Sequence, residues 1–309
     1  MSKQITGSVL MVRPSDFTFN AETAVDNEFQ NKPEGDVTAT VLAEFAESVA
    51  LLRAEGIKVS VQEKILGLPQ LPDAVFPNNW FSTRPDGTVF MFPMHTTNRR
   101  AERLQFPHVD QLLAANGHSL SRVLTLLDDN AEGNALEGTG SMVIDHEEGI
   151  VYAAVSIRTD PEKLMQYCKL TGTRPLPFRT ESSTGKPFYH TNVVLSIGPG
   201  FAVICADCIR DTKEKNDVLT ALRKNHEVIE ISLEQAETGF CANILTLEKP
   251  DGNSLIVMSV RAFEGFTEAQ KGTLNKYGKL LALPIPTIEH IGGGSARCMM
   301  AEVFLPEER

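Results

Sequence analysis

The sequence predicts an α/β fold made of five strand-strand-helix-strand units arranged around a common axis. Hairpin patterns recur roughly every 50 to 60 residues, and a helical pattern and another short apolar run follow each of them. Apolar runs near both chain ends supply the parts of one more unit. Because such units cannot each bury a core alone, we expect a single domain over residues 1–309.

Four hairpins are predicted where two apolar runs flank turn residues, at 81–91, 142–155, 193–206 and 244–260. A helix is expected after each hairpin, at 101–116, 160–169, 211–224 and 267–281. Asp160 and Thr267 are plausible caps for two of these helices, and Asp211 or Thr212 for a third. A strand then completes each unit, at 123–127, 176–178, 228–231 and 285–288.

The unit that completes the set of five is predicted at the N-terminus and is the first in chain order, with a strand at 9–12, a helix at 38–55 and a strand at 57–61. Its missing partner strand is expected at the other end of the chain, at 299–305. This pairing would join the two termini and leave no open sheet edge.

Composition indicates an ordinary soluble protein, with 42% hydrophobic and 22% charged residues among 309. The net charge of −11 argues against nucleic acid or an anionic membrane surface as a partner. No segment approaches the roughly 18 apolar residues of a membrane span, and residues 1–6 show no secretory signal. Five irregularly spaced cysteines suit reduced thiols, so we expect a cytoplasmic protein, and the sequence leaves a homo-oligomer open.

Residues with catalytic or binding chemistry stand where the hairpins begin. In a ring of repeats these equivalent positions converge on one end of the axis, where they would face a shared pocket. A thiol, an imidazole and a carboxylate are the groups that covalent cysteine chemistry needs. The residues at this phase of the repeat are Phe76, Asn78, Asn79, Glu137, His190, Asn192 and Cys298.

Cys298, taken alone, fits a small buried residue as well as a nucleophile. His190 alone is more typical of a structural histidine, and Glu137 of a carboxylate in a surface turn. Their common phase in the repeat favours the functional interpretation. Cys205 and Cys208 form a C-x-x-C pair, but no second pair follows at zinc spacing, so a metal site is not expected.

With these residues in place, the chain resembles the guanidine-modifying, or pentein, superfamily. That superfamily includes arginine deiminases, dimethylarginine dimethylaminohydrolases, agmatine deiminases and amidinotransferases. Its fold is a five-bladed α/β propeller with pseudo-five-fold symmetry, which matches the repeat over essentially the whole chain. The run Gly-Gly-Gly-Ser-Ala-Arg-Cys-Met at 292–299 is similar to the arginine deiminase nucleophile segment. The resemblance implies that Cys298 is the nucleophile, His190 the general acid/base and Glu137 the guanidine-binding carboxylate.

Two arginines resemble family residues that hold the substrate α-carboxylate. They are Arg158 in the segment 156–159 and Arg100 in the segment 98–102, where Arg100 is preferred to Arg99. Phe76, Asn78, Asn79 and Asn192 complete the predicted substrate contacts.

Two departures from the deiminase pattern bear on the substrate. Deiminases carry Asp two residues after the catalytic His and at the end of a Phe-Thr-Arg-Asp segment, where this chain has Asn192 and Asn79. Carboxylates suit a cationic guanidinium, whereas amides offer N–H donors that suit a carbonyl oxygen. The sequence therefore predicts a citrulline hydrolase that forms ornithine, ammonia and carbon dioxide, similar to the citrulline-utilisation branch, without a metal or organic cofactor.

Two alternatives stay open at this point. The protein could be a deiminase or dihydrolase of arginine or a substituted arginine, because amides also bind a guanidinium when Glu137 supplies the charge. It could also be a ring protein that binds an amino acid without catalysis. Segments 16–35 and 179–187 are predicted lids over the pocket.

Overall fold

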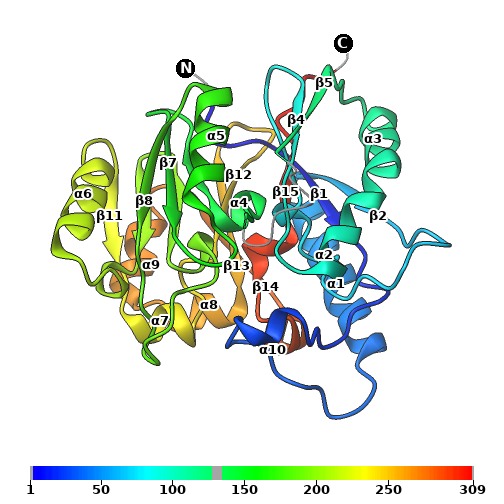
Figure 1. The fold of residues 1–309 in the computed structure, drawn as a ribbon, viewed down its shortest axis with the longest axis horizontal. Coiled ribbons are helices and arrows are strands. Elements are labelled where there is room, and N and C mark those ends of the chain that lie inside the picture. Colours follow the sequence, from blue (N-terminus) through cyan, green and yellow to red (C-terminus); the bar gives the residue numbers. More distant parts are fainter. Residues whose placement is uncertain (1–2, 127–133, 308–309) are drawn as a thin grey trace.

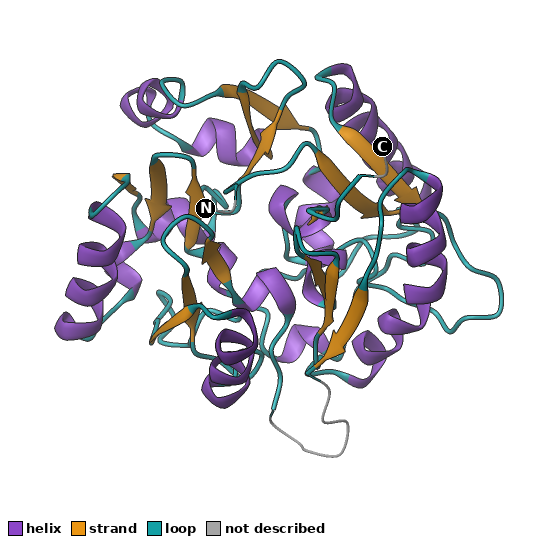
Figure 2. Ribbon diagram, turned by 90° about the horizontal axis from the view of Figure 1, so that it is seen from above, coloured by secondary structure: helices purple, strands orange, loops and turns teal. Residues whose placement is uncertain are grey.

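The computed structural model describes residues 3–126 and 134–307. Within these ranges the strands form five three-stranded sheets, each with one antiparallel and one parallel strand pair. Figure 2 shows the sheets around the middle of the molecule, with the longer helices toward its periphery. The predicted α/β repeat is thus present.

The sheets follow the predicted units in chain order. Their strands are β1 (Ser8–Val12), β2 (Lys58–Gln62) and β15 (Ala301–Glu302); β3 (Phe81–Thr83), β4 (Thr88–Met91) and β5 (Arg122–Thr125); β6 (Val143–Asp145), β7 (Ile150–Ala154) and β8 (Arg174–Phe178); β9 (Leu195–Gly198), β10 (Phe201–Ile204) and β11 (Glu227–Glu230); β12 (Leu245–Glu248), β13 (Ser254–Ser259) and β14 (Lys279–Leu283).

The helices vary from single turns to the 17-residue α1. They are α1 (Thr38–Ala54), α2 (Thr97–Arg100), α3 (Phe106–Ala115), α4 (Gly138–Ser141), α5 (Pro161–Thr171), α6 (Thr212–Arg223), α7 (Leu233–Glu237), α8 (Val260–Gly265), α9 (Glu268–Leu274) and α10 (Pro286–Gly292). Short 3-10 turns are η1 (Thr23–Val25), η2 (Pro77–Asn79), η3 (Ala101–Gln105), η4 (Thr191–Val193), η5 (Ala206–Cys208) and η6 (Ala296–Met299).

The middle strands β1, β4, β7, β10 and β13 are buried along nearly their whole length. Strands buried on both faces read as continuous apolar runs, which is why the hairpins were visible in the sequence. The predicted caps are present too, since Asp160, Asp211 and Thr267 accept backbone N–H groups in the first turns of α5, α6 and α9.

The two ends of the chain meet in one sheet. β15 pairs antiparallel with β1, with Val9 opposite Glu302 and Leu10 opposite Ala301. The Val303 N–H also donates to the Ser8 carbonyl at 2.8 Å. Both termini consequently lie at the same side of the molecule in Figure 1. The last strand spans only two residues, shorter than the predicted 299–305, and Cys298 lies on η6 before it.

The predictions for the end of the fifth unit were wrong. The helix expected at 267–281 ends at Leu274, and the strand of that unit is β14 (Lys279–Leu283) rather than 285–288. Gly278 lies between the end of the helix and the start of the strand. A Cβ there would lie 2.6 Å from the Ser254 carbonyl oxygen, so this close approach of the two backbones requires glycine. Pro286 then begins α10, a position that suits proline because the first helical N–H has no intrahelical partner.

Two smaller differences concern the second unit. The helix expected at 101–116 begins as the 3-10 turn η3 and becomes α-helical only at Phe106. The strand expected at 123–127 is β5 (Arg122–Thr125), and residue 127 lies outside the described residues. In the described parts of the chain, none of the helices combines the length and apolarity needed to span a bilayer.

Candidate active site

Four short helical turns, each leading into the first strand of a sheet or into β15, bring the predicted residues together. They are η2, α4, η4 and η6, and α4 contacts both η2 and η4 while η2 contacts η6. Asn79 ends η2, Glu137 precedes α4, His190 precedes η4, and Cys298 lies within η6. The common phase seen in the sequence thus corresponds to one cluster in space.

Glu137 and His190 form a buried hydrogen-bonded pair, with 2.8 Å between Oε2 and Nε2. The other Glu137 oxygen accepts the His95 backbone N–H at 2.9 Å. Burial raises the pKa of Glu137, but Arg158, His190 and Arg99 outweigh burial and hold that pKa well below its usual range. Burial lowers the pKa of His190 despite Glu137, so the imidazole is neutral near pH 7.

The Cys298 thiol lies at the wall of a small buried cavity. Its sulfur accepts N–H groups from two carboxamides, at 3.5 Å from Asn192 Nδ2 and 3.3 Å from Asn243 Nδ2. Residues from several units of the repeat surround the cavity. The lining residues are Asn27, Gln30, Asp73, Phe76, Asn79, Arg99, Arg158, Tyr189, His190, Gly292, Gly294 and Cys298.

Arg158 is where the sequence analysis placed it, but Arg100 is not. The Arg158 guanidinium is buried at the cavity, 3.7 Å from Glu137. Arg100 donates to the carbonyls of Met94 and His95 instead, and it does not line the cavity. Arg99 lines the cavity in its place, and its guanidinium lies 3.7 Å from Glu137. Two arginines thus face the pocket, as predicted, but the second is Arg99.

Asn79, Asn78 and Phe76 all lie in the buried turn beside the cavity. Arg99 Nη1 donates to Asn79 Oδ1 at 2.8 Å, and because arginine can only donate, this bond fixes the orientation of the amide. Among the described residues, Asn79 Nδ2 then has no hydrogen-bond partner, and neither amide atom of Asn78 has one. Phe76 and Asn79 line the cavity, whereas Asn78 does not.

The two predicted lid segments lie against each other, and the first of them lines the cavity. In segment 16–35, Asn27 donates to the Gly293 carbonyl at 3.2 Å and Gln30 to the Gly292 carbonyl at 3.0 Å. Figure 1 shows this segment beside α10. Glu28 accepts hydrogen bonds from Ser182 and Thr184 and pairs with Lys186 in segment 179–187. Asp26 binds both Nε and Nη2 of Arg158 at 2.6 Å.

Three residues of the site were not predicted. Asn243 stands at the same repeat phase as Asn192, so its position in the repeat was the signal that could have identified it. Arg99 could not be separated from Arg100 by spacing alone. Asp73 precedes the Phe76 turn, and its Oδ2 accepts from Asn20 and Thr23. In the described chain Asp73 Oδ1 has no partner although it is buried at the cavity.

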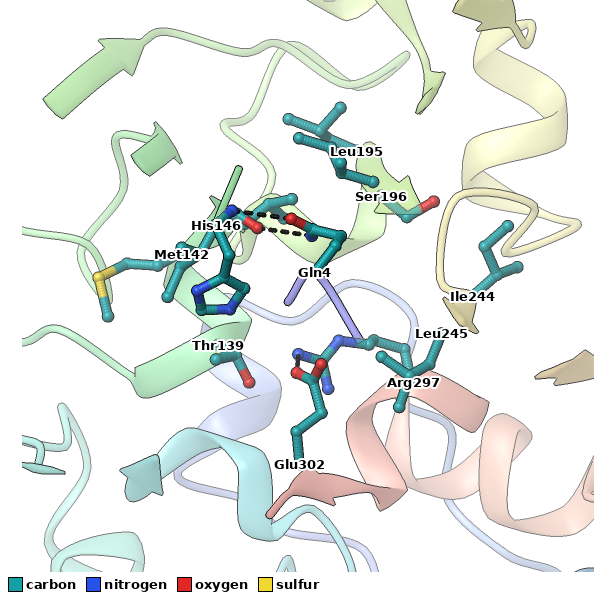
Figure 3. A pocket seen from close by; sticks show the side chains of 13 residues that line it. Gln4, Thr139, Met142, His146, Leu195, Ser196, Ile244, Leu245, Arg297 and Glu302 are labelled. Carbon is teal, nitrogen blue, oxygen red and sulfur yellow. Dashed lines mark hydrogen bonds and ion pairs between the residues drawn. The ribbon is translucent and has the colours of Figure 1, made fainter. Parts of the chain in front are cut away.

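A second cavity lies on the other side of the nucleophile turn. Gln4, Thr139, His146, Ser196, Arg297 and Glu302 are among its lining residues. Figure 3 shows Arg297 and Glu302 pointing toward each other, and Arg297 Nη2 lies 2.7 Å from Glu302 Oε2. The Arg297 side chain therefore anchors η6 from behind, while Cys298 faces the first cavity.

Gly140 has no side chain, and two residues of the site occupy the space where its Cβ would lie. A Cβ at this position would lie 2.3 Å from Asn79 Nδ2 and 2.7 Å from His190 Nδ1. Arg99 and Glu137 hold these two side chains, so neither can move away freely. We expect Gly140→Ala to lower kcat/KM about a hundredfold, since a displacement of about 1 Å costs this much in a positioned site.

Steady-state kinetics and a melting curve test this expectation. Gly272→Ala is the matched control, because its Cβ would meet open space within α9 and alanine favours helix. Full activity of Gly140→Ala would contradict the assignment of these side chains to the site.

The family described as N,N dimethylarginine dimethylhydrolase, eukaryotic, matches residues 13–305. The chain belongs to this family. It is thus a member of the pentein superfamily of guanidine-modifying enzymes and a hydrolase of carbon–nitrogen bonds other than peptide bonds. A search of curated proteins finds no match to the sequence.

Solved structures share the fold of this dimethylarginine dimethylhydrolase family member at low sequence identity. ArgZ, an arginine dihydrolase from the ornithine-ammonia cycle in cyanobacteria, has a TM-score of 0.73 and 17% identity over 97% of this chain and 41% of ArgZ. AgrE, solved with ornithine and NAD+, has a TM-score of 0.73 and 18% identity over 97% of this chain and 39% of AgrE. A dimethylarginine dimethylaminohydrolase has a TM-score of 0.66 and 13% identity over 98% of this chain and 100% of its own. The chain therefore spans about two fifths of full-length ArgZ and AgrE.

Proposed function

We propose that the protein hydrolyses the ureido group of citrulline to ornithine, ammonia and carbon dioxide. The observation that carries this proposal is the set of N–H donors around Cys298. Asn79, Asn192 and Asn243 present amide groups there, and Arg99 and Arg158 add two buried positive charges. A guanidinium can only donate hydrogen bonds and would leave these amide donors unmatched, whereas a neutral ureido oxygen accepts hydrogen bonds from them.

Glu137 offers little free hydrogen-bonding capacity to a cationic substrate. That carboxylate already binds His190 and lies 3.7 Å from each of the two arginines. Among the described residues that line the cavity, Asn79 Nδ2 is a buried donor without a partner, and it fits the ureido oxygen. Asp73 Oδ1 is a buried acceptor of the same lining without a partner, and it fits the substrate ammonium group or an N–H of the ureido group.

The chemical steps use three side chains. The Cys298 thiolate attacks the ureido carbon and forms a C–S bond, while the C–N bond to the leaving amine breaks. His190 takes the thiol proton as the thiolate forms, gives it to that amine, and then takes a proton from the water that cleaves the thiocarbamoyl intermediate. The carbamate that results loses carbon dioxide. Glu137 holds the imidazole through Nε2, which leaves Nδ1 as the nitrogen that exchanges protons.

The substrate carboxylate binds at Arg158, with Arg99 as the second positive charge. Because Asp26 holds two of the Arg158 nitrogens, segment 16–35 must move when the substrate enters. Arg99 keeps its bidentate bond to Glu102, at 2.8 and 3.0 Å. Its Nε and Nη2 are therefore not free to bind the substrate, and it contributes only its charge. Phe76 packs against the glycines before η6 and closes the pocket wall.

A second candidate is a hydrolase of arginine or a substituted arginine. The family description names dimethylarginine, and the free Oδ1 of Asp73 could accept N–H groups of a guanidinium. The third reading, an amino-acid-binding protein without catalysis, predicts that Cys298 is alkylated no faster than Cys168 or Cys241.

Incubation with citrulline and with arginine separates these candidates. We expect ornithine and ammonia from citrulline, and arginine turnover at least about tenfold lower. Asn79→Asp and Asn192→Asp should move the preference toward arginine, because each replaces an amide with a carboxylate that can pair with a guanidinium. Conversion of arginine to citrulline, with citrulline inert, would overturn the proposal.

The same proposal covers the domain organisation, the cellular compartment and the cofactor requirement of the protein. The chain works as one catalytic domain over residues 1–309, and its five sheets close into a propeller through the β1–β15 pairing. It acts in the cytoplasm, where its cysteines stay reduced, and it uses no metal or organic cofactor.

A further inference from the structure

Two carboxamides share the same arrangement around the nucleophile. Asn243 Nδ2 donates to the Asn192 carbonyl at 3.0 Å and to Cys298 Sγ at 3.3 Å. Asn192 Nδ2 donates to the Thr139 carbonyl at 3.3 Å and to the same sulfur at 3.5 Å. Each NH2 group thus divides its two hydrogens between a backbone carbonyl and the thiol sulfur.

Backbone groups fix the orientation of both amides. Asn243 Oδ1 accepts the Arg297 N–H at 3.1 Å, and a backbone N–H can only donate. The Thr139 carbonyl can only accept, which places the NH2 of Asn192 toward it. The two carboxamide oxygens lie farther from the sulfur, at 3.9 Å for Asn192 and 3.7 Å for Asn243.

This geometry suits a negatively charged sulfur. All three side chains are buried, and a hydrogen bond to a charged group is stronger where water is excluded. Among the described residues, the hydrogen-bond partners of Cys298 Sγ are the two asparagines. The two N–H donors are therefore placed to stabilise a negative charge that develops on the sulfur.

We infer that Asn243 is a catalytic residue, which with Asn192 stabilises the negative charge on Cys298 Sγ as the thiolate forms. As the thiolate forms, its proton passes to the neutral His190, at the nitrogen that is not bonded to Glu137, and it later leaves with the departing amine. The inference rests on the proposed function in one respect. A neutral ureido substrate brings no positive charge to stabilise the thiolate, so the protein must supply that stabilisation itself.

Alkylation of Cys298 by iodoacetamide at fixed neutral pH, without substrate, tests the inference. Mass spectrometry of the Cys298 peptide gives the rate. We expect Asn243→Asp to slow alkylation at least about tenfold, because it removes the donor and adds a negative charge beside the sulfur. The aspartate keeps an oxygen for the Arg297 N–H, so the fold should be retained. Asn243→Ala removes the donor without adding charge and should slow alkylation several-fold.

Asn253→Asp is the matched control, since it makes the same charge change in an exposed turn between β12 and β13. Its alkylation rate should equal that of the unmodified protein. The ultraviolet thiolate absorbance lost on Cys298→Ser measures the thiolate fraction without dependence on reagent access, and it should fall in both Asn243 variants. Unchanged alkylation and absorbance in folded Asn243→Asp and Asn243→Ala would overturn the inference. Because no substrate is present, inactivity toward citrulline would instead count only against the proposed function.

Discussion

The Cys298→Ser variant is expected to release no measurable ornithine from citrulline, with kcat reduced at least about a thousandfold. A serine hydroxyl is a far weaker nucleophile than a thiolate. Because the C–O bond of serine is shorter than the C–S bond of cysteine, the serine oxygen cannot keep both amide contacts, which are 3.3 and 3.5 Å for the sulfur. The exchange changes one atom within η6, so the fold should be unaffected. Ornithine formation followed over time and a melting curve of the same preparation check both expectations.

Cys241→Ser provides the control for this variant. Cys241 is equally buried, but its sulfur contacts the Ala262 carbonyl rather than the catalytic side chains. Its activity should be that of the unmodified protein. Ornithine release by Cys298→Ser at a rate close to that of the unmodified protein would rule out a covalent intermediate on Cys298.

The repeat was predictable because its signals are local. Each hairpin combines apolar strands with a turn sequence, such as Pro85-Asp86-Gly87 or Pro250-Asp251-Gly252, and these positions form the observed turns. The fifth unit was misassigned because apolar residues at 279–283 fit the end of a helix as well as a strand. In the folded protein this segment pairs in parallel with β13, and that pairing makes it a strand. The pairing forms only when the chain folds, so the local sequence does not show it.

The sequence could predict those site residues that share an equivalent position in the repeat. Glu137, His190, Asn192 and Cys298 occupy equivalent turns, and the structure brings them together. Arg99 and Arg100 are neighbours on α2, so their side chains point in different directions, and only the packing of Glu102 and Asn79 selects Arg99. The role of each residue in catalysis stays a prediction.

Asp73 and Asp26 show a different limit of the sequence. Asp73 lies in an irregular segment before η2, and Asp26 follows η1 in the predicted lid. Neither residue belongs to the repeat, so no periodic pattern marks it. Their positions depend on long-range contacts, Asp73 with Asn20 and Asp26 with Arg158. Such contacts between irregular segments leave no signal in a single sequence.

Glu137→Gln is expected to impair both stability and activity, because Glu137 is the carboxylate shared by His190, Arg99 and Arg158. Glutamine keeps the shape and an acceptor for the His95 N–H but removes the buried negative charge. Removing one member of a buried ionic cluster costs about 3 kcal/mol, the lower end of the usual range, because Arg158 keeps Asp26 and Arg99 keeps Glu102. Denaturant unfolding of the purified variant measures this loss.

The activity of Glu137→Gln should fall by roughly a hundredfold to ten-thousandfold, since His190 loses the carboxylate that orients its ring and supports its protonated form. Glu230→Gln, an exposed carboxylate paired with Arg223, controls for the change in net charge and should leave stability and kcat unchanged. The size of the two effects separates the roles of Glu137. A loss of stability with unchanged kcat would make Glu137 a structural counter-ion of the arginines, and not part of the catalytic set.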